Sequence, residues 1–82
     1  MDKRFPAVRS LDGISVGETA FARTVRAVIQ STDAENVQPG LAAIAEATLH
    51  EPWTVYRWLR GLTEPSSAVQ RRVRAMLPAD AA

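Results

Sequence analysis

The stretch from Pro52 to Gly61 constrains the fold most strongly, because it holds a helix-start signal and a helix-stop signal close together. Proline is favoured at the first position of a helix, where its missing N–H would have no partner. Glycine is favoured just past the last turn. The apolar residues of this stretch recur at helical spacing, at Val55, Trp58, Leu59 and, beyond the glycine, Leu62. The stretch therefore predicts a short helix over residues 52–60 with one buried face.

The outward face of this predicted helix has an unusual composition for a surface in contact with water. It carries two aromatic residues and two arginines, at Trp53, Tyr56, Arg57 and Arg60. A solvated helix face normally consists of lysine, glutamate, glutamine or serine. Aromatic side chains beside arginines on one exposed face therefore indicate a binding surface, and nucleic acid is the first candidate.

A first helix is predicted well ahead of this stretch. Ser15 and Glu18 have the spacing of a capping box, although Gly17 weakens the first turn and can move the start toward Thr19. Phe21, Val25, Val28 and Ile29 then form an apolar stripe, which predicts a core-facing helix that ends near residues 30–31. Residues 32–38 are polar and turn-rich, so they are expected to form a loop.

Two more helices complete the prediction. One opens at Pro39-Gly40 and ends near Thr48, with an inward face of Leu41, Ile44 and Ala45. The other begins after Pro65 and ends before Pro78, with an apolar stripe of Val69, Val73, Met76 and Leu77. Because no segment has the alternating pattern of a strand, we expect an all-α, compact four-helix domain with a central helix-turn-helix. Leu49 is expected to lie buried under its corner.

The two ends of the chain differ from this middle part. Residues 1–14 lack clean periodicity and are basic through Lys3, Arg4 and Arg9. They are expected to form a flexible arm, which either reaches along a DNA groove or has no role. Residues 15–78 form the predicted helix-turn-helix domain, and residues 79–82 form a frayed tail.

The composition excludes several classes of protein. With 82 residues, of which 46% are apolar, the chain can build one domain around one core. It has no cysteine, which excludes disulfides and thiolate metal sites and fits a reducing compartment. The lone histidine, His50, has no partners for a metal, so neither a zinc site nor any other cofactor is expected. No leader and no apolar run of membrane length is visible, which indicates a cytoplasmic protein without a membrane partner.

The positive charge is concentrated in the C-terminal part of the chain. The net charge is only +1 at pH 7. Residues 52–77 nevertheless contain a single acid, Glu64, against five arginines, at positions 57, 60, 71, 72 and 74. Such a local block is a plausible footprint for a polyanion. The alternative is that Arg71, Arg72 and Arg74 simply solvate the outside of the last helix.

Two short helices joined by a tight corner, the second with arginine and aromatic residues outward, have the pattern of a helix-turn-helix. This pattern resembles the Cro/phage-repressor type of helix-turn-helix domain, which is the lambda repressor-like class. The residues that carry the resemblance are Ile44-Ala45-Glu46, then Pro52-x-Thr54-Val55-x-Arg57-Trp58-Leu59-Arg60-Gly61, then Pro65-Ser66.

The resemblance covers residues 17–77 and has three departures. Leu49-His50 stand where that class usually has a glycine and a small aliphatic residue. Glu51 stands where it usually has a serine or threonine cap. The loop between the first and second helices is also longer than usual.

The resemblance implies roles for particular residues of the helix over 52–60. Contacts to base edges would fall at Trp53, Tyr56 and Arg57, with Pro52 against the groove wall. Phosphate contacts would fall at Arg60, Ser66 and Thr54. Physical chemistry agrees, because arginine can pair with guanine O6 and N7 and an aromatic edge can pack on a thymine methyl. Trp58 is expected in the core, whereas Trp53 could instead contact a neighbouring helix or a dimer partner, and Tyr56 could be a plain surface tyrosine.

The leading interpretation is a sequence-specific DNA-binding transcriptional regulator, a repressor or autoregulator of the phage, mobile-element or antitoxin kind. It would bind double-stranded DNA as a homodimer, because one small domain has little surface for tight specific binding. The alternative is a protein-interaction module that uses the face of Trp53, Tyr56 and Arg57. An enzyme is not expected, since the chain lacks cysteine, paired carboxylates at workable spacing and a glycine-rich phosphate loop.

Overall fold

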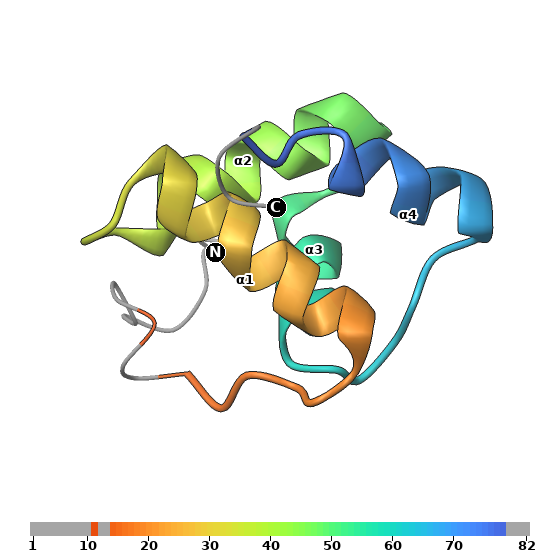
Figure 1. The fold of residues 1–82 in the computed structure, drawn as a ribbon, viewed down its shortest axis with the longest axis horizontal. Helices are drawn as coiled ribbons and strands as arrows, with labels where there is room; N and C mark the ends of the chain where they lie inside the picture. The colour runs from red at the N-terminus through yellow and green to blue at the C-terminus, as the bar shows by residue number, and fades with distance from the viewer. Residues whose placement is uncertain (1–10, 12–13, 79–82) are drawn as a thin grey trace, which may run out of the picture.

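The computed structural model describes residue 11 and residues 14–78 of the chain. Within them lie four α-helices and no strand: α1 (Ala20–Thr32), α2 (Val37–Thr48), α3 (Pro52–Leu59) and α4 (Ser67–Arg74). The prediction of an all-α, four-helix domain is confirmed. In Figure 1, α1 lies across the front of the domain, α2 runs along its top, and α3 lies behind α1.

The start of α1 is set by Thr19, whose hydroxyl accepts a hydrogen bond from the backbone N–H of Ala22 at 3.0 Å. The helix therefore begins later than Ser15, as the weakening effect of Gly17 indicates, and Ser15 and Glu18 form no capping box around it. Residues 15–18 instead run without regular structure ahead of the helix. The apolar stripe of α1 is buried as expected, at Phe21, Val25, Val28 and Ile29.

The start of α2 is two residues earlier than the Pro39-Gly40 signal predicts. Asp33 Oδ1 accepts hydrogen bonds from the backbone N–H groups of Glu35 and Asn36, at 2.9 and 3.1 Å. Asn36 then caps the helix by accepting from the N–H of Gln38 at 3.0 Å. These side chains bond the backbone locally, so the connection shrinks to residues 33–36 rather than 32–38.

The helices α1 and α2 lie in close contact at Gly40. A Cβ at this position would lie only 2.6 Å from the Cα of Ile29. Both residues are buried, and Ile29 is fully inaccessible to solvent. The side-chain-free surface at Gly40 therefore lets the two backbones pack together in the centre of the domain.

All four helices contribute to one core, since α1 packs against α2, α3 and α4, and α2 also packs against α3 and α4. Residues near the start of the chain add to this core. Ile14 is buried and Leu11 packs against the cluster, and the N–H of Ile14 donates to the Leu11 carbonyl at 3.0 Å. The predicted arm over 1–14 is therefore wrong for these two positions. Residues 1–10 and 12–13, including Lys3, Arg4 and Arg9, lie outside the described residues.

The last helix is shorter than its apolar stripe predicts. Ser66 caps α4, and its Oγ accepts from the N–H of Val69 at 3.4 Å. The helix ends at Arg74, and Met76 and Leu77 lie partly buried in the turns that follow. The predicted tail over 79–82 lies outside the described residues. In residue 11 and residues 14–78, no helix has the length and apolar character needed to cross a membrane.

Candidate nucleic-acid interface

The corner between α2 and α3 comprises residues 49–51, and Leu49 directs its path. Leu49 has φ 58° and ψ 42°, the left-handed helical conformation. Its N–H donates to the Glu46 carbonyl at 3.4 Å, and the N–H of His50 donates to the Ala45 carbonyl at 2.9 Å. This pair of hydrogen bonds is a Schellman motif, which usually places glycine at the left-handed residue. Leu49 therefore joins α2 to α3 by a tight corner.

The side chain of Leu49 is 89% exposed, so the prediction that it is buried under the corner is wrong. The left-handed backbone turns this side chain away from the core. The residue just before the corner, Thr48 at the end of α2, is buried instead, and its hydroxyl donates to the Ile44 carbonyl at 2.8 Å. Leu49 thus combines an unfavourable backbone conformation with a solvent-exposed apolar side chain.

His50 packs beneath the corner against the core tryptophan. Its ring meets the Trp58 ring edge-on, with the ring centroids 5.0 Å apart. Its Nδ1 lies 2.7 Å from the Thr48 carbonyl oxygen, so Nδ1–H donates to this carbonyl. The imidazole therefore supports Trp58 from the corner side, although the residue as a whole is exposed.

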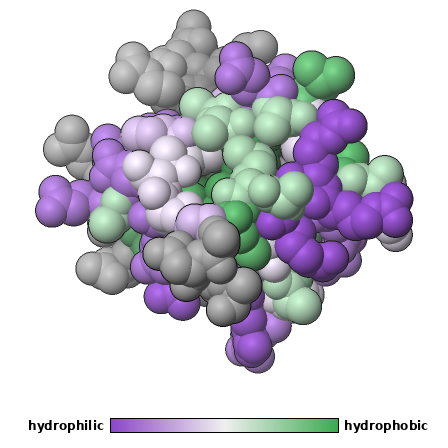
Figure 2. All heavy atoms as spheres, turned by 45° about the horizontal axis from the view of Figure 1, so that its top comes forward, coloured by the Kyte–Doolittle hydropathy of each residue, from purple (hydrophilic) through white to green (hydrophobic). Residues whose placement is uncertain are grey.

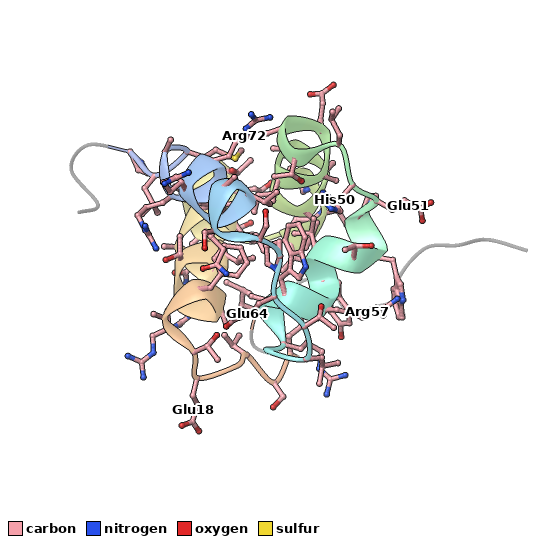
Figure 3. The ribbon with its side chains drawn as sticks, turned by 90° about the vertical axis from the view of Figure 1, so that its right-hand side faces the viewer. Glu18, His50, Glu51, Arg57, Glu64 and Arg72 are labelled. Atoms are coloured by element: carbon pink, nitrogen blue, oxygen red, sulfur yellow. The ribbon has the colours of Figure 1, made fainter. Side chains whose placement is uncertain are left out.

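The start of α3 matches the prediction, with Pro52 as its first residue. Glu51 has the extended backbone of an N-cap residue, φ −87° and ψ 150°, but its side chain makes no capping hydrogen bond. In Figure 3 the side chains of Glu51 and Arg57 point away from the molecule on the outer side of α3. The carboxylate is therefore a negative charge at the edge of the candidate interface.

The inner face of α3 holds the helix against the rest of the domain. Val55, Trp58 and Leu59 are buried, as predicted. The Trp58 ring also meets the Phe21 ring of α1, with centroids 5.8 Å apart and planes inclined by 58°. Trp58 is thus packed between α1 and the corner, which fixes the orientation of α3 about its axis.

The end of α3 repeats the hydrogen-bond pattern of the corner. The N–H of Gly61 donates to the Trp58 carbonyl at 3.0 Å, and the N–H of Leu62 donates to the Arg57 carbonyl at 3.0 Å. Gly61 has φ 74°, which turns the chain sharply out of the helical path. Leu62 therefore does not continue the buried stripe; it is 59% exposed, and the prediction that it faces the core is wrong.

Gly61 also touches the segment that leads into α1. A Cβ on Gly17 would lie 2.5 Å from the Cα of Gly61, and the Gly17 N–H donates to the Leu59 carbonyl at 2.9 Å. The two glycines let the backbones meet without side chains between them. The end of α3 is consequently fixed to the start of the domain as well as to its core.

Tyr56 does not lie on the outward face, where the sequence pattern puts it. It is only 9% exposed and belongs to the core cluster. On the helix, Tyr56 lies beside the buried stripe, and its long ring reaches the core from there. The ring is stacked on the indole of Trp53, with centroids 5.5 Å apart and planes inclined by 26°. Tyr56 therefore supports Trp53 from below and has little surface left for a direct base contact.

The other residues predicted to contact DNA differ in how exposed they are. Four of them are exposed along α3 and at its two ends: Pro52, Trp53, Arg57 and Arg60. Thr54 is half-buried on the same helix, and Ser66 is exposed but caps α4 with its hydroxyl. We call the exposed set of Pro52, Trp53, Arg57 and Arg60 the α3 outer face. It carries two positive charges around one large indole.

The arginines of α4 form a second basic region. Arg71, Arg72 and Arg74 are all exposed. Figure 2 shows strongly hydrophilic side chains gathered on the right-hand side of the molecule, where α4 lies. Arg72 reaches from α4 to α2, where its guanidinium donates to the Ala47 carbonyl at 3.4 Å (Figure 3). The sequence offers no signal for this contact, which joins residues far apart in the chain.

The described part of the chain holds neither a candidate metal site nor a buried polar side-chain atom without a partner. Residue 11 and residues 14–78 contain no cluster of histidine and carboxylate side chains that could hold a metal ion. Every buried polar side-chain atom among them has a hydrogen-bond partner. The α3 outer face is therefore the surface that most needs a functional explanation. No protein-family model, curated protein or solved structure matches the chain.

Proposed function

We propose that this chain is a DNA-binding transcriptional regulator of the Cro/phage-repressor type, and a binding protein rather than an enzyme. The observation that carries the proposal is the α3 outer face. A short helix, oriented by Trp58 and fixed at both ends by backbone hydrogen bonds, exposes one indole and two guanidinium groups on one side. A rigid helix of this kind suits insertion into the major groove, which is wide enough to admit one.

The exposed residues have separable roles in this proposal. Arg57 and Trp53 contact base edges, and Pro52 lies against the groove wall. Arg60, at the end of the helix, contacts a phosphate, and so does the region around Ser66. Tyr56 is assigned a supporting role under Trp53, because it is buried. Phosphate contacts position the helix, and contacts to base edges provide specificity.

We further propose that the regulator binds as a homodimer. A single module of this size buries only about 600–1,000 Å² on DNA, which is small for tight specific binding. Two copies would place their α3 helices in successive major grooves about one helical turn apart, on a partly palindromic operator.

The test is an anisotropy titration on duplex DNA from directly upstream of the chain's own gene, at two salt concentrations. Affinity should fall with a slope of about 0.9 log units per log unit of salt for each phosphate contact. Arg60→Ala should weaken binding to all sequences equally. It should also reduce the slope of log affinity against log salt by about 0.9, the value for one phosphate contact. Arg57→Ala should weaken specific binding by about 1–3 kcal/mol and relax preference at one position. Arg23→Ala is the matched control, because Arg23 is an exposed arginine on α1.

A protein-interaction module is the second candidate. The observation that favours it is the 89% exposure of Leu49, the first residue of the corner. Exposed apolar side chains mark a protein contact where they form one contiguous patch, as Leu49 and Trp53 would have to do under this alternative. A protein contact anchored by Leu49 and Trp53 would respond little to ionic strength. Absence of a salt-dependent DNA complex, with retained folding, would therefore exclude the leading proposal.

A further inference from the structure

We propose that Trp53 reads the C5-methyl group of a pyrimidine, so that the chain prefers thymine or 5-methylcytosine to the same base without its methyl group. This inference rests on the proposed function of the α3 outer face and names the feature of DNA that it reads. It concerns a residue that is 41% exposed at the second position of α3.

The chemistry of indole limits what Trp53 can recognise. An indole has a single N–H donor and no acceptor, so it cannot form the two parallel hydrogen bonds by which arginine or asparagine recognises a base. Its exposed surface is otherwise apolar. The thymine methyl is the apolar feature that the major groove offers, and 5-methylcytosine presents the same group at the same ring position. An exposed indole on a helix in this groove therefore suits the methyl group.

The stacked pair of Trp53 and Tyr56 makes this contact selective. The Tyr56 ring is 9% exposed, and the Trp53 indole lies on it with centroids 5.5 Å apart. A side chain that is already ordered loses less conformational freedom when it binds. It also cannot easily move aside for a base that lacks the methyl group. The buried tyrosine thus sets where the indole surface lies relative to the groove.

Arg57 defines the neighbouring part of the sequence that is read. Trp53 and Arg57 are four residues apart on α3, so they are neighbours on the helix surface. Base pairs are stacked about 3.4 Å apart along each strand, so neighbouring side chains reach bases one or two steps apart. Since arginine pairs best with guanine, the expected feature is a methylated pyrimidine within two steps of a guanine.

The experiment begins with the duplex that the chain itself selects from a random pool, so that binding as such is established first. Each thymine of this duplex is then replaced in turn by deoxyuridine, which removes only the methyl group. At one thymine in each half-site, affinity should fall about 4-fold, the change expected when one methyl-sized group is no longer buried. If a cytosine stands at that position, its methylation at C5 should raise the affinity of the duplex by a similar factor.

Two variants assign the effect to a side chain. In Trp53→Ala, the affinity ratio between thymine and deoxyuridine DNA should fall to 1. In Arg57→Ala, overall affinity should fall while the ratio stays near 4. Because each ratio compares two DNAs on the same protein, a partial loss of stability leaves it unchanged.

The possible failures are distinguishable. If no duplex is selected, the proposed DNA-binding function is wrong. If a duplex is bound and no thymine in it responds to deoxyuridine, the function stands and the methyl inference is wrong. A methyl effect that persists in Trp53→Ala would also overturn it, because another residue would then make the contact.

Discussion

The indole of Trp53 lies stacked on the ring of Tyr56, at a centroid distance of 5.5 Å, so an exposed residue of α3 rests on a buried one. Trp53→Ala should lower the free energy of unfolding by about 1 kcal/mol, which is the contribution of an aromatic pair. Tyr56→Ala should lower it by about 3 kcal/mol, because it also leaves a cavity in the core. Urea denaturation followed by circular dichroism measures both. Equal losses in the two variants would mean that Tyr56 contributes nothing to the core beyond its stacking on Trp53.

Leu49 has a positive φ of 58° and an exposed side chain, so glycine should be better at this position for stability. The left-handed conformation costs about 1–2 kcal/mol for an ordinary residue, and the greater freedom of glycine in the unfolded chain offsets part of the gain. Leu49→Gly should therefore raise the free energy of unfolding by about 0.5–1 kcal/mol. Leu49→Val should lower it, because a β-branched residue tolerates positive φ poorly. Thermal unfolding of both variants and the native chain measures these changes in stability. A glycine variant less stable than the native chain would contradict the prediction.

Glu51 occupies the N-cap of α3 without forming a capping hydrogen bond. Serine has a shorter side chain that can accept from the N–H groups of the first turn, so Glu51→Ser should stabilise the domain by about 0.5–1 kcal/mol. If the proposed function is right, the same change should also tighten DNA binding, because it removes a negative charge beside the α3 outer face. Glu64→Ser is the control, since Glu64 is an exposed acid outside any helix. Matching gains in stability from both substitutions would argue against a cap effect.

The contact between Gly17 and Gly61 leaves no room for a methyl group. A Cβ on Gly17 would lie 2.5 Å from the Gly61 Cα and 2.8 Å from the carbonyl carbon of Arg60. Gly17→Ala should destabilise the domain by about 2 kcal/mol or more, within the range of overpacking. Gly61→Ala should do the same, because its φ of 74° adds strain. The double variant should be less destabilised than the sum of the two, because both substitutions break one contact. Denaturant titration of the three variants provides the comparison, with Glu18→Ala as a control of expected small effect.

Much of the fold follows from local sequence signals, and α3 illustrates why. Pro52 and Gly61 act on the backbone at the two ends of the helix, and Val55, Trp58 and Leu59 share one side. The position of this helix and the burial of these three residues could therefore be predicted. The start of α2 could not, because Asp33 and Asn36 bond the backbone in a pattern that the later Pro39-Gly40 signal obscures.

The candidate site was harder to predict, because exposure depends on contacts across the fold. Leu49 was expected in the core as an apolar residue, but the left-handed turn at that residue directs its side chain outward. Tyr56 was expected outside, but its position beside the buried stripe lets a long ring reach the core. The packing of Gly17 on Gly61 and the bond from Arg72 to the Ala47 carbonyl join distant segments, and no pattern along the chain indicates them.

Both α2 and α3 end in the same Schellman hydrogen-bond pattern, with Leu49 before α3 and Gly61 after it. The frame that holds α3 is thus built mainly from main-chain bonds and inward side chains, to which Trp53 adds only its stacking on Tyr56. If the proposed function is right, point substitutions on the α3 outer face can change the DNA sequence that is bound while this frame stays in place. Such a chain could then acquire new targets in single evolutionary steps, and an engineer could retarget it by the same route.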